Sequence, residues 1–167
     1  VAVTLSSQLK KDELDLLINH SRPIVIFTFD EKLADLSALR DENCLRTIIS
    51  PQGDMSFNDL MERGSGNFRA VDSERGDTAA ILYTGGTTGL PKGVMLSHEN
   101  IISASNSYGR IVQMEKGDEL LSAAPLSWIG EQGFNVSRFL TVGAHYNFPE
   151  ETETLRKDLL ELQPFYF

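Results

Sequence analysis

Short apolar segments alternate with amphipathic segments along almost the whole chain. The clearest apolar segment is residues 23–28, which Ile and Val dominate and which Pro and Asp bound. The amphipathic segment before it carries Leu14, Leu17 and Ile18, whose spacing matches one face of a helix. This alternation predicts an α/β fold with a mostly parallel sheet flanked by helices.

The expected elements follow one another in regular order. We expect strands at residues 1–5, 23–28, 45–49, 78–84, 94–96, 119–124 and 144–148, and helices at 10–20, 30–39, 56–61, 97–112, 129–140 and 152–162. Residues 23–28 should form a central strand covered on both faces. Ser56 and Ser97 should each cap the helix that follows. Residues 62–77 lack periodicity, so we expect an exposed connection between approximate halves 1–77 and 78–167.

Charge and cysteine content restrict the partners and the compartment. A formal net charge of −9 argues against nucleic acid or anionic lipid as the main partner, because both attract basic surfaces. The single cysteine, Cys44, excludes a disulfide framework and favours a reducing compartment, so we expect a cytoplasmic location. No apolar segment approaches the roughly 20 residues of a membrane-spanning helix. Oligomeric state and peripheral contact with a membrane stay open.

A turn between two expected strands has an unusual composition. Residues 83–93 contain four glycines, three threonines and one lysine. Glycines let successive backbone N–H groups face one concavity, which binds anions. Threonine hydroxyls add donors, with Thr84 a candidate Mg²⁺ ligand, and Lys92 adds a mobile positive charge. The pattern matches neither the Walker loop nor the dinucleotide fingerprint, and the alternative is a flexible hairpin connection.

The same segment, Y-T-G-G-T-T-G-L-P-K-G, resembles the signature Y-T-S-G-T-T-G-x-P-K-G of the AMP-binding, acyl-adenylate-forming superfamily. It departs from the signature at Gly85, where Ser is usual; this removes one hydroxyl and keeps the backbone donors. The resemblance implies that the chain, residues 1–167, is a fragment of the large N-terminal domain of such an enzyme. It also implies that the loop binds the phosphates of ATP through Thr84, Gly85, Gly86, Thr87, Thr88, Gly89 and Lys92.

Two downstream segments narrow the resemblance. Residues 96–101 and 124–132 both fall at the superfamily's spacing. The first has a simple explanation as a helix cap, and the alternative is a catalytic role for His98. Trp128 stands where His is common, which resembles bacterial long-chain fatty acid:CoA ligases. Trp128, Gln132 and Phe134 are therefore candidates for an acyl pocket, because an apolar wall suits an alkyl chain. The alternative is that Trp128 belongs to the ordinary core.

The resemblance implies a two-step reaction of the parent enzyme. A fatty carboxylate attacks ATP to give acyl-AMP and pyrophosphate, and CoA then displaces AMP, so ATP, Mg²⁺ and CoA are the expected co-substrates. The chain has no initiator Met and ends in aromatic residues, so we expect an excerpt of a longer protein. The catalytic residues and the C-terminal domain should follow Phe167, and the isolated fragment should be nearly inactive.

Two alternatives remain open. One is a domain that adenylates an amino acid or another carboxylate; a carrier-protein domain or a pocket Asp would favour it, and neither is seen. The other is a nucleotide-binding module without catalytic activity, which Gly85 and the absent catalytic segments would favour.

Overall fold

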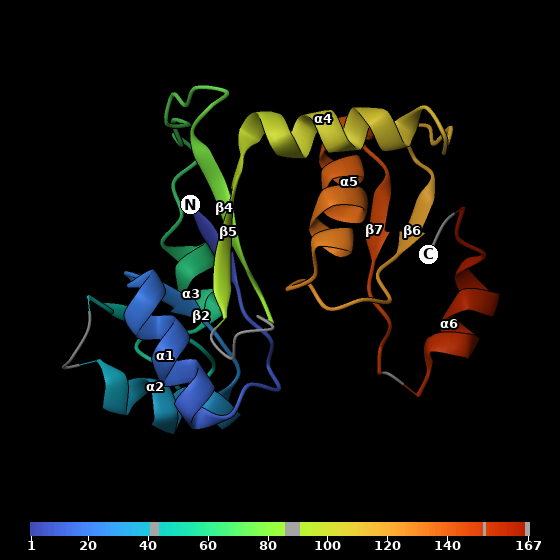
Figure 1. The fold of residues 1–167 in the computed structure, drawn as a ribbon. Helices are drawn as coiled ribbons and strands as arrows, with labels where there is room; N and C mark the ends of the chain where they lie inside the picture. Colours follow the sequence, from blue (N-terminus) through green and yellow to red (C-terminus); the bar gives the residue numbers. More distant parts are fainter. Residues whose placement is uncertain (41–43, 86–90, 152, 166–167) are drawn as a thin grey trace. The chain divides into compact units, whose positions relative to one another are not determined.

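The computed structural model describes residues 1–40, 44–85, 91–151 and 153–165. The chain divides into two compact units, each containing helices and parallel strand pairs (Figure 1). We call Gln8–Asp72 the inserted unit, and Val1–Ser7 together with Ser73–Phe167 the main unit. Three of the four strand pairings among the described residues are parallel, which confirms the predicted α/β class.

The inserted unit is built around a small parallel sheet. Its elements are α1 (Lys11–Ser21), β2 (Val25–Phe27), the 3₁₀ helix η1 (Asp30–Lys32), α2 (Leu33–Leu39), β3 (Thr47–Ile49) and α3 (Phe57–Glu62). Strands β2 and β3 pair in parallel. The buried apolar side chains that form its core come from α1, α2 and the β3 region: Leu14, Leu17, Ile18, Leu36, Leu39, Leu45, Ile48 and Ile49.

The prediction that residues 23–28 form a strand covered on both faces is wrong. Val25 is 43% exposed and Phe27 is 62% exposed, whereas Ile26 between them is partly buried. Successive side chains of a strand point to opposite faces, so the two exposed residues share one face of β2. Within the inserted unit, no described element covers that face well enough to bury them.

Helix α3 begins with the predicted cap, Ser56. The Ser56 hydroxyl accepts a hydrogen bond from the Asp59 backbone N–H at 3.1 Å, and the Asp59 carboxylate accepts one from the Ser56 N–H at 3.0 Å. The Ser56 hydroxyl also donates to the Asp59 carboxylate at 2.7 Å, and this bond, followed by the one from the Ser56 N–H, holds the pKa of Asp59 below its ordinary value. Asp30, the first residue of η1, instead bonds to a distant segment, because its carboxylate accepts from the Gln52 N–H at 3.0 Å.

The main unit begins with a three-stranded sheet. Strand β1 (Ala2–Thr4) pairs in parallel with β4 (Thr78–Thr84), and β5 (Lys92–Ser97) pairs with β4 in antiparallel fashion, giving the order β1-β4-β5. After it come α4 (His98–Gly109), β6 (Glu119–Leu121), the π-helical segment η2 (Glu131–Val136), α5 (Ser137–Val142), β7 (His145–Asn147) and α6 (Leu155–Leu162). Strands β6 and β7 pair in parallel.

Helix α4 begins with the predicted cap. The Ser97 hydroxyl accepts from the Asn100 N–H at 3.1 Å, and the Asn100 side chain accepts from the Ser97 N–H at 3.0 Å. The helix packs against η2 and α5, and the buried Ser105 hydroxyl lies 2.9 Å from that of Thr141. A small apolar cluster of Met114, Leu120 and Ala144 is packed against by Val142 of α5 and Tyr146 of β7.

The helix expected at residues 129–140 exists, but it is not a regular α-helix. Residues 131–136 have the wider π-helical hydrogen-bonding pattern before α5 continues to Val142. Stretches of π-helix occur frequently at functional sites, because the added residue displaces neighbouring side chains from their α-helical positions. Within the described ranges, every helix is too short or too polar to span a bilayer.

Candidate functional site

The base of the glycine-rich hairpin is open. Thr84 lies opposite Lys92 in the β4–β5 ladder, and both residues are exposed. Gly85 is exposed as well, and a Cβ placed on it would meet no atom within 4 Å. The described part of the hairpin therefore presents an exposed hydroxyl, an exposed glycine and an exposed ammonium to a ligand. The other predicted phosphate-binding residues, Gly86, Thr87, Thr88 and Gly89, lie outside the described residues.

Gly93, at the base of the hairpin, has little room for a side chain. A Cβ at this position would lie 3.1 Å from Ile81 Cγ2 and 3.3 Å from the ring of Tyr83, its partner in the ladder. These separations are shorter than ordinary carbon contacts, so a larger residue would push the Tyr83 ring away. The glycine thus lets an aromatic ring of β4 lie close to the backbone of β5.

The chemistry of the hairpin base fits a phosphate group. Hydroxyl, backbone N–H and ammonium groups are the donors that bind phosphate in Gly-rich loops. Thr84 supplies one oxygen that suits Mg²⁺. Among the described residues there is no group of three His, Cys, Asp or Glu side chains placed to hold a metal ion.

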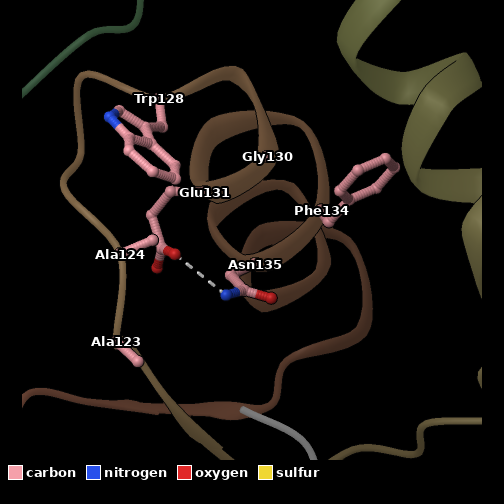
Figure 2. Close-up of a pocket in the computed structure, with 7 residues that line it drawn as sticks. All are labelled: Ala123, Ala124, Trp128, Gly130, Glu131, Phe134 and Asn135. Carbon is pink, nitrogen blue, oxygen red and sulfur yellow. Dashed lines mark hydrogen bonds between the residues drawn. The ribbon is translucent and has the colours of Figure 1, made fainter.

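A cavity of about 330 Å³ lies in the main unit, beside η2. Figure 2 shows the residues that line it: Ala123, Ala124, Trp128, Gly130, Glu131, Phe134 and Asn135. Two of the three acyl-pocket candidates, Trp128 and Phe134, are among them. Trp128 is 63% exposed, so it does not belong to the buried core of the described residues.

The three candidates are held in different ways. Phe134 packs against Tyr108 of α4 with ring centroids 4.6 Å apart, which fixes one wall of the cavity. Trp128 donates its backbone N–H to the Pro125 carbonyl at 2.9 Å. Gln132 does not line the cavity; its side-chain amide donates to the Leu126 carbonyl at 2.8 Å and so fastens the preceding turn.

Glu131 is a residue of the cavity that the sequence did not single out. It is only 2% exposed, and its carboxylate accepts a hydrogen bond from the Asn135 side chain at 3.0 Å (Figure 2). Its other oxygen accepts from the hydroxyl of Tyr146 on β7. None of the ion pairs found among the described residues involves Glu131. We call Glu131, Asn135 and Tyr146 the carboxylate clamp.

Tyr146 is held as a hydrogen-bond donor. Burial, followed by the neighbouring Glu131 carboxylate, raises the pKa of Tyr146 well above its ordinary value near 10. Its ring also packs edge-on against Phe148, with centroids 4.8 Å apart. The only sequence signal for the clamp was an acidic residue three positions after Trp128 inside an expected helix.

A second cavity, of about 450 Å³, lies in the inserted unit between β2, β3 and the start of α3. Its wall includes the exposed rings of Phe27, Phe29 and Phe57. None of the residues that line it is predicted to bind phosphate or an acyl chain.

Known proteins resemble this chain in sequence and in structure. A family model described as AMP-binding enzyme matches residues 1–164. The chain is 30% identical over 187 aligned positions to long chain acyl-CoA synthetase 6, peroxisomal, of Arabidopsis thaliana, covering 100% of this chain and 26% of the relative. It is 27% identical over 143 positions to the long-chain-fatty-acid–CoA ligase FadD13 of Mycobacterium tuberculosis, covering 85% of this chain and 27% of that protein.

Solved structures give the same fold. A long-chain-fatty-acid-CoA ligase (FadD1) from Archaeoglobus fulgidus matches with a TM-score of 0.83 and 25% identity, over 97% of this chain and 33% of that chain. ATP-bound MatB from Rhodopseudomonas palustris matches with a TM-score of 0.79 and 28% identity, over 94% of this chain and 32% of that chain. The chain thus spans about a quarter to a third of the length of these proteins.

Proposed function

Because this chain belongs to the AMP-binding enzyme family, we propose that the full-length protein is a long-chain fatty acid:CoA ligase. In this reaction a carboxylate oxygen attacks the α-phosphorus of ATP, the bond to pyrophosphate breaks, and acyl-AMP forms. The thiol of CoA then attacks the acyl carbon and AMP leaves. The names of the relatives in Arabidopsis and Mycobacterium support the long-chain acid as substrate.

The observation that carries the proposal is the open hairpin base of Thr84, Gly85 and Lys92. Negative charge grows on pyrophosphate as it leaves, and donors held in advance near that charge stabilise the transition state. Lys92 would follow the phosphates as a mobile cation, and the amides of residues 84–89 would fix them. Mg²⁺ would enter with ATP and screen phosphate charge, with the Thr84 hydroxyl as one candidate ligand.

The cavity beside η2 would receive part of the acyl group. Trp128 and Phe134 give it two aromatic walls, and each methylene removed from water contributes about 0.8 kcal/mol. Gln132 would act on the cavity indirectly, because its amide holds the turn that carries Trp128. We expect the residues that bind adenine and the catalytic residues to lie beyond Phe167.

The deciding experiment is ATP–pyrophosphate exchange by the full-length protein with a panel of carboxylic acids. Exchange that depends on long-chain fatty acids, and release of acyl-CoA when CoA is added, would support the ligase. Exchange driven by amino acids alone would support an amino-acid-adenylating enzyme instead. Nucleotide binding without exchange for any acid would support a non-catalytic module.

Two further expectations concern the activity of the isolated chain and the cellular location of the protein. The 167-residue chain alone should exchange little or no pyrophosphate, because it lacks most of the length of its relatives. We place the protein in the cytoplasm on the basis of its single cysteine. Cell fractionation tests this, since the Arabidopsis relative is named as peroxisomal.

A further inference from the structure

We propose that Glu131 and Tyr146 are positioning residues that decide which acyl groups the cavity accepts. The proposal rests on the proposed function of the cavity as an acyl site. Neither residue needs to react with a substrate. They act by fixing the place of the cavity wall that η2 provides.

The clamp joins the wall of the cavity to the sheet behind it. Glu131 is the first residue of the π-helical segment, and the same segment contributes Phe134 and Asn135 to the wall. One carboxylate oxygen of Glu131 is bonded within the segment, to Asn135, and the other is bonded to Tyr146 on β7. The single carboxylate therefore sets both the internal shape of η2 and its position against β7.

Trp128 depends on the same attachment. Its carbonyl accepts the Gln132 backbone N–H at 3.1 Å, so Trp128 lies one helical turn before the clamped segment and is bonded to it. Figure 2 shows the Trp128 ring beside the Glu131 side chain and the Phe134 ring on the opposite side of the helical coil. A movement of η2 would consequently shift both rings relative to Ala123 and Ala124, which line the same cavity and lie outside η2.

The use of a carboxylate here points to positioning more than to stability. Burying a carboxyl group costs free energy, and apolar side chains of similar size would stabilise a core equally well. Two directional hydrogen bonds instead define one arrangement of the groups that they join. A cavity that must discriminate between acyl groups needs a wall with one defined position, since a single methylene changes selectivity by about tenfold or more.

Kinetics of the full-length enzyme test the proposal. Tyr146→Phe removes the bond to β7, and we expect it to change the ratio of kcat/KM for two fatty acids that differ by two methylenes by about tenfold. KM for ATP should remain unchanged. Glu131→Leu should have the same effect, and Glu131→Gln should restore much of the wild-type ratio, because the amide oxygen can still accept from Tyr146.

Ser105→Ala is the matched control. It also removes a hydrogen bond of a buried hydroxyl in the main unit, and Ser105 does not line the cavity. It should lower the Tm without changing the acyl preference. If Tyr146→Phe lowers the Tm in the same way and leaves the acyl ratio unchanged, the clamp is only structural and the proposal is overturned.

A spectroscopic measurement separates this proposal from the proposed function. Trp128 is the only tryptophan of the 167-residue chain, so its emission reports on the cavity wall alone. Tyr146→Phe should shift the emission of Trp128 to longer wavelength and steepen its quenching by acrylamide, with the circular dichroism spectrum unchanged. Unaltered emission and quenching would count against the clamp. Absence of acid-dependent exchange in the full-length protein would instead remove the ligase assignment and leave this measurement standing.

Discussion

Thr84 lies directly opposite Lys92 where the β4 and β5 strands enter the glycine-rich turn. The antiparallel ladder thus brings a hydroxyl and an ammonium to the same end of the hairpin, although seven residues separate them in the sequence. Both side chains are exposed. The position of the ammonium is set by the strand, while its flexible stem lets it follow a moving phosphate group.

Lys92→Ala should therefore lower the rate of fatty-acid-dependent ATP–pyrophosphate exchange in the full-length protein. Loss of one group that stabilises charge in a transition state costs on the order of a hundredfold in rate. Lys11→Ala, which removes an exposed lysine on α1, is the control and should leave the rate unchanged. Equal rates for both variants would exclude Lys92 from the reaction.

Trp128→Ala should weaken the binding of long-chain acids. The substitution removes one aromatic wall of the cavity, and loss of apolar contact worth about 1.5–3 kcal/mol would raise KM for the acid by about tenfold or more. Ile111→Ala, at a side chain that is 81% exposed and outside the cavity, provides the comparison. Initial rates at varied acid concentration measure the effect, and an unchanged KM would place the acyl chain elsewhere.

Alkaline pH should destabilise the main unit through Tyr146. Its folded pKa is raised by burial and by Glu131, so the native state holds a proton that the unfolded chain releases near pH 10. The stabilisation is fully present below about pH 10 and is lost as the pH rises toward the folded pKa. Urea unfolding at increasing pH measures it. The free energy of unfolding of Tyr146→Phe should fall less steeply with pH above pH 10. A slope equal to that of wild type would contradict this assignment.

Acidic pH should act through Glu119. The hydrogen bond from His145, followed by that from Asn147, lowers the pKa of Glu119. A depressed folded pKa gives stability that is present above the unfolded value near 4.3 and is lost as the pH falls through the folded value. Glu119→Gln should therefore reduce the dependence of Tm on pH below about pH 5. If Tm falls identically with pH in the variant and the wild type below this pH, other carboxylates account for the loss of stability in acid.

Gly53 should tolerate no side chain. A Cβ at this position would lie 2.5 Å from the Ile48 carbonyl oxygen and 2.8 Å from the Ser50 hydroxyl. Since the nearest atom belongs to the backbone, Gly53→Ala should destabilise the inserted unit by about 1–3 kcal/mol. Gly66→Ala is the control, because a Cβ there would meet nothing within 4 Å. Thermal unfolding compares the two variants, and similar Tm values would refute the steric argument.

The sequence predicted the elements whose signals are local. The strand at 78–84 has the predicted bounds, and Ser56 and Ser97 cap their helices as expected, because the acceptor and donor of each cap are three residues apart. The hairpin signature was likewise contiguous in the chain. Helix 129–140 was predicted as an element, but its π-helical stretch was not, since periodicity does not distinguish the two helix types.

What the sequence by itself determined is the order of strands and helices, their caps, and the family to which the glycine-rich turn belongs. Only the tertiary structure decided that β1 pairs with β4, that one face of β2 is exposed, and that Tyr146 meets Glu131. The physical reason is the distance along the chain over which each interaction acts. Propensity, capping and turn chemistry act over a few residues, whereas strand pairing and the burial of a carboxylate depend on which distant segments the folded chain brings together.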